Sequence, residues 1–247
     1  MEAEKKKQMI KLWIAITVMA IILIVVIAIM IRYEVEGDKN MPFNLSKIVL
    51  VSTAEGVESE GKNKWNFNVY QNNDVYFYID KNENYHGKNN TIHRIKIENI
   101  KITESPTKGE VKAYMPNSIE GRLYSYAEEY MVDDKLEYRG GIKSNPQTLE
   151  IGNQGGSVLI RFSNINLGNY SSDKDKEIVH DGTLLKKLNV ENDEIKFKVS
   201  FDFIITVTNC SYKANISLDL PYGNIIENGT ESFENINTDE IVFKRIK

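Results

Sequence analysis

Cysteine is almost absent from this sequence of 247 residues, which contains a single one, Cys210. One thiol cannot form an internal disulfide, so a disulfide-stapled scaffold is excluded. It also cannot supply the several thiolates of a cysteine-rich zinc or iron–sulfur centre. Histidine is scarce too, and His86, His93 and His180 lack the spacing of a zinc motif. We therefore expect no metal and no other cofactor.

An excess of positive charge is missing as well. The chain has 31 Lys+Arg and 35 Asp+Glu, a formal net charge of -4. Such a balance gives no electrostatic reason to bind a polyanion, so we expect no nucleic-acid partner. The sequence has no nucleophile elbow, phosphate-binding loop or dinucleotide fingerprint. Asp80–Asn84 resembles the start of a calcium loop, but Tyr85 replaces the required glycine and Thr91 the bidentate glutamate. We interpret this segment, and the acidic run Asp173–Glu177, as ordinary solvated loops.

A long apolar run is present near the N-terminus. Residues 12–31 carry no charge, and at about 1.5 Å per residue they span roughly 30 Å, the thickness of the hydrocarbon core of a bilayer. The run is longer than the apolar part of a cleaved signal peptide, and Arg32 follows it in place of a small-residue cleavage site. The sequence therefore predicts an uncleaved transmembrane signal anchor.

Charges on the two sides of this run indicate its orientation. Residues 1–11 form a basic tail with four lysines, whereas the segment after the run mixes Arg32 and Lys39 with acidic residues. The positive-inside rule places the tail in the cytoplasm and the rest of the chain outside it. Residues 32–46 are polar and are interrupted by Gly37 and Pro42, which predicts a stalk.

Beyond the stalk, residues 47–247 alternate with the period of β-strands. The longest alternation runs from Ile195 to Thr208, with apolar side chains at the odd positions, and it leads through a turn into a second alternating run at residues 212–220. Residues 65–70 and 75–79 also alternate, and we interpret Gln71–Asp74 between them as a hairpin turn. The buried side changes parity at Glu98–Asn99, which predicts a β-bulge. A last strand is expected near residues 240–246.

Two segments have helical spacing. Leu123, Tyr126, Ala127, Tyr130 and Met131 fall on one helical face, and Asp181 is placed to cap a short turn that carries Leu184, Leu185 and Leu188. The fold class that we predict is all-β: a two-sheet β-sandwich of about ten strands with a small helical insertion. Two smaller sandwiches divided near residues 117–146 are the alternative.

Tyr76 and Tyr78 are the candidate binding residues. They lie on the strand face opposite Val75, Phe77 and Ile79, and exposed rings on a sheet can stack against a sugar or hold a partner protein. If the face is covered by the tyrosine-rich insertion, the same residues belong to the core.

The sequence contains no catalytic constellation, so we expect a binding or assembly module at the cell envelope and not an enzyme. The expected partners are the membrane and an envelope protein or a glycan. Abundant Ile, Asn and Lys, whose codons are AT-rich, indicate a bacterium. The alternatives are a glycan hydrolase that uses two carboxylates brought together by the fold, and a subunit of a larger membrane complex.

Overall fold

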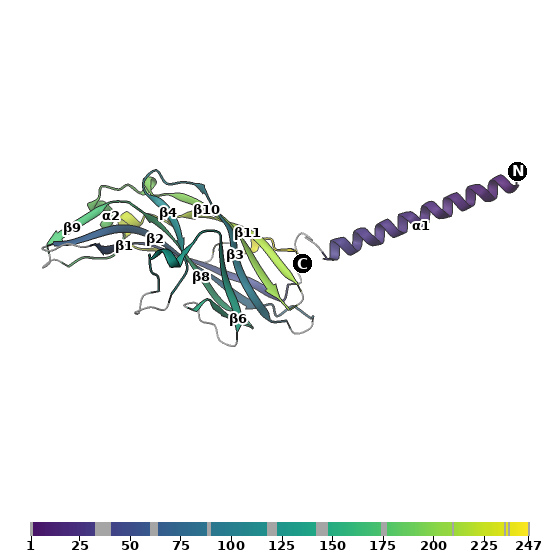
Figure 1. The fold of residues 1–247 in the computed structure, drawn as a ribbon, viewed down its shortest axis with the longest axis horizontal. Coiled ribbons are helices and arrows are strands. Elements are labelled where there is room, and N and C mark those ends of the chain that lie inside the picture. The colour runs from purple at the N-terminus through teal and green to yellow at the C-terminus, as the bar shows by residue number, and fades with distance from the viewer. Residues whose placement is uncertain are drawn as a thin grey trace.

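The computed structural model describes residues 2–32, 41–59, 64–87, 90–117, 123–141, 148–173, 177–208, 210–234, 236 and 238–246. It contains one long N-terminal helix, α1 (Glu2–Arg32), and a β domain (Figure 1). The span Glu4–Met30 of α1 is long and apolar enough to cross a membrane, and none of it is buried against the β domain. The helix begins at Glu2, so the basic tail predicted at residues 1–11 continues the helix toward the N-terminus.

In the part of the chain that the structure describes, thirteen strands form two sheets, which confirms the predicted two-sheet sandwich with somewhat more strands than expected. The first sheet has the order β12-β1-β2-β8-β4-β5, with β9 also paired to β2, and the second has the order β13-β11-β10-β3-β6-β7. The bounds are β1 (Phe43–Ser59), β2 (Lys64–Lys81), β3 (Ile92–Glu104), β4 (Glu110–Tyr114), β5 (Met131–Val132), β6 (Lys135–Gly141), β7 (Glu150–Gly152), β8 (Gly156–Ile165), β9 (Asn169–Asp173), β10 (Phe197–Val207), β11 (Ser211–Leu220), β12 (Glu231–Glu234) and β13 (Lys244–Arg245). Both sheets combine strands from early and late parts of the chain, so these strands form one sandwich.

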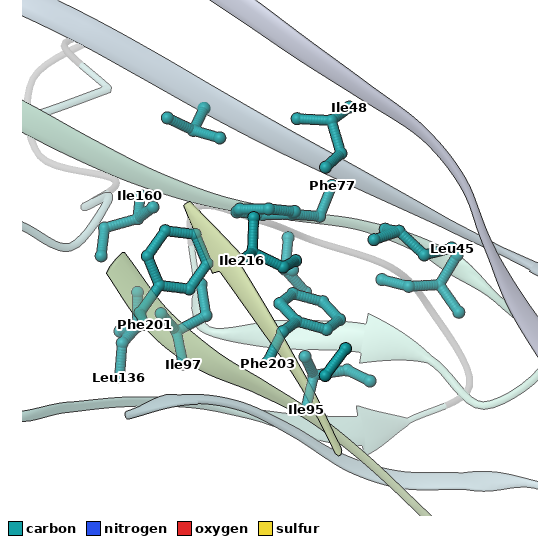
Figure 2. Packing of buried hydrophobic residues seen from close by; sticks show 14 of the residues in the cluster. Leu45, Ile48, Phe77, Ile95, Ile97, Leu136, Ile160, Phe201, Phe203 and Ile216 are labelled. Carbon is teal, nitrogen blue, oxygen red and sulfur yellow. The ribbon is translucent and has the colours of Figure 1, made fainter. Parts of the chain in front are cut away.

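The core lies between the two sheets. Phe77 from β2 faces Phe201 and Phe203 from β10, with ring centroids 5.8 and 4.8 Å away (Figure 2). The odd positions of β10 from Phe197 to Val207 are all buried, which confirms the alternation read from the sequence. The hairpin partner β11 pairs with β10 along almost its whole length.

The predicted bulge is also confirmed. The register between β3 and β10 shifts between Ser200 and Asp202, opposite Asn99. Asn99 has φ 56°, a left-handed conformation that asparagine tolerates better than most residues. The extra residue lets Ile95 and Ile97 face the core before the bulge while the parity changes after it.

Two predictions of local structure are wrong. Gln71–Asp74 is not a turn, because β2 continues through it and pairs there with both β1 and β8. Residues 123–131 do not form a helix: only Glu128–Tyr130 make a 3₁₀ turn, and the chain then enters β5. By contrast, the short helical turn is confirmed as α2 (Thr183–Lys187). Its N-cap position is Gly182 and not Asp181, although the Thr183 N–H donates to Asp181 Oδ1 over 2.8 Å.

A second, smaller apolar cluster covers the end of the first sheet that extends past the second one. Helices α2 and α3 (Ile225–Asn228) contribute Leu184, Leu185 and Ile225, which pack against Ala54 of β1 and Val69 of β2. In Figure 1, α2 and β9 lie at this end of the β domain, opposite the end where the C-terminus lies.

The sheet begins before the predicted boundary at residue 47. Of the stalk predicted at residues 32–46, Arg32 ends α1, positions 33–40 lie outside the described residues, and Phe43 already opens β1. Met41, Phe43 and Leu45 are buried in the main core.

This boundary makes a testable difference for a soluble fragment. We expect residues 41–247 to fold into a β-rich domain, and a fragment that starts at residue 47 to be at least about 3 kcal/mol less stable, because it loses three buried apolar side chains. Urea unfolding followed by circular dichroism measures the difference. Equal midpoints for the two fragments would contradict the assignment of residues 41–46 to the core.

Candidate functional site

The predicted binding residues lie on the outer face of the first sheet, turned away from the second sheet. Tyr78 is 37% exposed, and the Lys47 ammonium lies 5.3 Å from the centre of its ring. Tyr76 is half-buried beside Asp74. Burial, followed by the negative charge of Asp74, raises the pKa of Tyr76. The face is therefore open at Tyr78 and partly covered at Tyr76.

An ion pair sits next to these tyrosines. Asp74 of β2 and Arg161 of β8 are register partners, and their side chains are only 12% and 11% exposed. Arg161 Nε and Nη2 donate to the two carboxylate oxygens over 2.6 and 2.8 Å. This two-pronged arrangement matches the guanidinium to the carboxylate and is the strong form of an ion pair.

A loop that we call the strap (residues 115–117 and 123–130) crosses the outer face above this pair. Arg161 lies over the ring of Tyr124, 4.1 Å from its centre. The Tyr126 hydroxyl donates to Glu55 over 2.8 Å and accepts from the Asn72 amide over 2.7 Å. The strap is thus fixed by polar contacts to residues of the polar quartet Gln71–Asp74 and to their neighbours.

The electrostatics of this network favour a permanently charged arginine. Burial lowers the pKa of the Arg161 guanidinium, but the hydrogen bonds and charge of Asp74 outweigh it, so the net direction is upward. Burial also raises the pKa of Tyr126 far above its ordinary value, against the opposing charge of Arg161. The network therefore holds one cation, the carboxylates of Asp74 and Glu55, and protonated tyrosines, an arrangement suited to fixing the strap.

Sequence reasoning missed this network because it assigned the polar quartet to a turn. The four side chains are buried in the middle of a strand, where they find partners: Ser52 donates to Asn73 over 2.8 Å and Ser163 donates to Asn72 over 2.7 Å. The sequence signal for a continuous strand was the alternation of apolar residues on both sides of the quartet, which keeps the same parity before and after it.

A second candidate site lies where the inner face of the first sheet runs past its covering helices. We call it the distal hollow, a cavity of about 340 Å³ lined by Glu55, Gly56, Val57, Glu58, Trp65, Phe67, Ile178 and His180. Gly56 is thirteen residues beyond Phe43, so at about 3.3 Å per residue the hollow lies roughly 43 Å along β1 from the strand's first residue. It therefore occupies the end of the β1–β2 hairpin away from the segment that joins α1.

Three rings stand in a row along the distal hollow. Trp65 and Phe67 stack with centroids 6.3 Å apart, and Phe67 meets the His180 ring edge-on at 5.9 Å. The Gly56 N–H donates to His180 Nδ1 over 3.3 Å. A Cβ at Gly56 would lie 3.2 Å from three Phe67 atoms, so glycine permits the close approach of the ring to the strand.

The two carboxylates of the hollow do not form a facing pair. Glu55 pairs in register with Tyr70 and Glu58 with Phe67, so alternation places them on opposite faces of β1. Glu55 Oε2 is already bonded to Tyr126. A glycan hydrolase needs two carboxyl groups on either side of one glycosidic bond, and this arrangement does not resemble that geometry.

The remaining candidates from the sequence stand apart. Among the described residues, no three His, Cys, Asp or Glu side chains are grouped so that they could hold a metal ion. His93 is exposed on β3, and Cys210 is a half-buried free thiol between β10 and β11. Of the three histidines, only His180 belongs to a described cluster of rings.

Comparisons with known proteins do not assign this chain to a family. No family model, no curated protein and no solved structure matches this chain. What is established is therefore its architecture: one N-terminal apolar helix able to span a membrane, followed by a two-sheet β-sandwich.

Proposed function

We propose that this chain is a single-pass protein of a bacterial cell envelope, with its N-terminus in the cytoplasm and its sandwich outside. It acts there by binding an envelope protein or a glycan. The four lysines ahead of the apolar run support this orientation, because cytoplasmic flanks carry the excess of positive charge.

The distal hollow is the observation that carries the proposal. Binding pockets typically enclose about 300–1,000 Å³ and combine apolar or aromatic walls with a few polar groups. The hollow has this size and this composition, with Trp65, Phe67 and Ile178 beside Glu58 and His180. It also occupies the end of the hairpin opposite the anchored end, where a tethered domain meets ligands.

Tyr78 and Tyr76 form the second candidate surface of the same binding function. Tyr78 presents an exposed ring on a sheet face, and aromatic residues are the usual anchors of protein and sugar contacts. The two surfaces lie on opposite faces of β2, so single substitutions can separate them.

Sedimentation of the full-length protein, in non-ionic detergent, with isolated cell-envelope material tests the proposal. We expect Trp65→Ala to weaken retention at least about tenfold, as the loss of a central aromatic anchor does. The matched control is Tyr78→Ala, which removes an aromatic side chain from the other surface and leaves the hollow intact. Melting curves of both variants check that the sandwich stays folded.

The possible outcomes distinguish the two candidate surfaces and test the binding function itself. Weaker retention for Tyr78→Ala alone would move the binding surface to the outer face of the first sheet. Unchanged retention for both variants, or no retention of the wild type, would contradict the proposed binding function. Release of soluble sugar from the envelope material by the wild-type protein would favour a hydrolase.

A further inference from the structure

Cations gather on one part of the outer face of the second sheet, although the chain as a whole has a net charge of -4. The odd positions of β10 are buried in the core, so its even positions and their register partners point outward. The name cationic patch is used here for five outward side chains of β3, β6, β11 and β13: Arg94, Lys96, Arg139, Lys213 and Lys244. Net charge is a sum over the whole chain, so it does not show where the cations lie.

Two pairs within the cationic patch place like charges directly opposite each other. Arg94 of β3 is the register partner of Arg139 of β6, and Lys213 of β11 is the register partner of Lys244 of β13. Like charges at opposite positions of neighbouring strands destabilise a sheet. An anion held against these pairs would relieve the repulsion, so the arrangement favours a negatively charged partner.

Carboxylates of the protein itself neutralise the cationic patch only in part. Three of its cations approach a carboxylate at 3.5, 3.7 and 3.9 Å, in the pairs Arg94–Glu137, Lys96–Glu98 and Lys213–Asp202. Partly exposed ion pairs of this kind contribute little free energy. Arg139 and Lys244 are exposed, and neither forms an ion pair within the described part of the chain. Both are therefore available to an anion from outside.

The cationic patch lies at the end of the sandwich nearest to α1. Met41, the first described residue after α1, lines one hollow together with Phe243, the chain neighbour of Lys244. In Figure 1 the C-terminus lies at the end of the β domain that is nearer to α1. Nine steps of the chain lead from Arg32 to Met41, and at no more than about 3.6 Å each they span at most about 32 Å. With α1 in a membrane, this tether holds the cationic patch close to the surface of the bilayer.

The far part of the same face carries a different balance of charge. Lys198 lies six residues along β10 from Ile204, or about 20 Å from the row that contains Lys96 and Lys213. It is held there between the carboxylates of Glu104 and Asp219, at 3.3 and 3.1 Å. An anionic surface attracts the cationic patch and repels these carboxylates. This gradient favours contact at the anchored end and keeps the far end away from the surface.

We infer that the cationic patch docks the sandwich onto the anionic phospholipid headgroups of the membrane that α1 spans. Each lysine or arginine near an anionic leaflet strengthens binding by about fivefold. The tether keeps the local concentration of headgroups high, so individually weak contacts are enough. The position beside the tether favours lipid over a soluble anionic polymer. The inference rests on α1 spanning a membrane and is independent of the ligand of the distal hollow.

Fluorescence of the full-length protein in lipid nanodiscs tests the inference. One set of discs contains phosphatidylcholine alone, and in the other set about a third of it is replaced by phosphatidylglycerol, which is anionic. Both sets carry some lipid with a spin label on the headgroup, which quenches a fluorophore on contact. Cys210 is the only cysteine, so a Cys210→Ala background leaves one labelling site. Bimane is attached at Ser211→Cys, beside the cationic patch, or at Ser217→Cys, about 20 Å farther along β11.

The label at position 211 is expected to be quenched at least about twofold more strongly in the anionic discs than in the neutral discs at low salt. At about 1 M salt the Debye length falls to about 3 Å, so this difference should vanish. The label at position 217 should show little difference between the discs, because carboxylates occupy that part of the face.

Two double variants assign the effect to the cationic patch. Arg139→Gln combined with Lys244→Gln should remove most of the quenching at position 211, since about fivefold is lost for each cation. This variant also relieves two like-charge contacts, so its melting temperature should not fall. Lys101→Gln combined with Lys186→Gln removes the same charge from exposed positions outside the cationic patch and should leave the quenching unchanged.

Equal quenching at position 211 in neutral and anionic discs, or none in either, would overturn docking through the cationic patch. An equal loss with the two double variants would show dependence on net charge alone and would also overturn it. Stronger quenching at position 217 than at position 211 would overturn contact at the anchored end. Binding of soluble polyglycerol phosphate without quenching in anionic discs would assign the cationic patch to a polymer and overturn lipid docking. None of these results changes the Trp65-dependent retention on envelope material, so this inference and the proposed binding function fail separately.

Discussion

A single charge at Phe201 is expected to prevent folding of the β domain. Phe201 has no exposed surface, and its ring packs edge-on against Phe77 and stacks on Phe162 at 6.2 Å. Removing such a ring costs about 3–5 kcal/mol, and burying an unpaired carboxylate adds several more. Since whole domains are stable by only about 5–15 kcal/mol, Phe201→Asp removes most or all of that margin.

The measurement is circular dichroism and thermal melting of the fragment 41–247. We expect Phe201→Asp to show no cooperative transition and the control Ser217→Asp to melt close to the wild type. Ser217 is exposed on β11 and pairs with Ser200, so its new charge stays in water. A wild-type melting curve for Phe201→Asp would contradict the inward orientation of the odd positions of β10.

That orientation was predictable because it depends on a local pattern. Alternation from Phe197 to Val207 requires only that one face of a strand is dry and the other wet, and the structure has that arrangement. The bulge at Asn99 was predictable for the same reason, since a change of parity within one strand has few other causes.

The errors arose where distant residues decide the local structure. A run of four polar residues resembles a turn when its partners are unknown, but Ser52 and Ser163, from other strands, satisfy Asn73 and Asn72 inside the sheet. Likewise, the helical spacing of residues 123–131 gave way to an extended strap, because Tyr124 and Tyr126 gain contacts with Arg161 and Glu55. Long-range polar contacts are not visible in the spacing of apolar residues.

The candidate sites also differ in whether a local sequence pattern or distant residues determine them. The outward direction of Tyr76 and Tyr78 follows from alternation along one strand, and the sequence was enough to predict it. The distal hollow forms because β1 and β2 extend beyond the second sheet and beyond helices α2 and α3. That depends on the relative lengths of elements far apart in the chain, so Trp65 and His180 could not be brought together from the sequence.

The buried ion pair gives the second large effect. We expect Arg161→Met to destabilise the domain by about 3–5 kcal/mol, because it leaves the Asp74 carboxylate buried without its partner. Asp74→Leu should cost a similar amount, since it leaves a buried guanidinium. The double variant should be markedly more stable than the sum of the two losses predicts, because it leaves neither charge alone.

Urea unfolding of the four proteins of this cycle, each as the fragment 41–247, measures the coupling between the two residues. The pair Lys47–Glu234 provides the matched control: it joins the same kinds of charges at 3.2 Å, but its side chains are 37% and 69% exposed. Its single variants, Lys47→Met and Glu234→Leu, should cost less than about 1 kcal/mol. Similar losses at both pairs would mean that water reaches Asp74 and Arg161, and the strap would then not seal the outer face. A large loss at the buried pair alone would show that water does not reach the two charges beneath the strap.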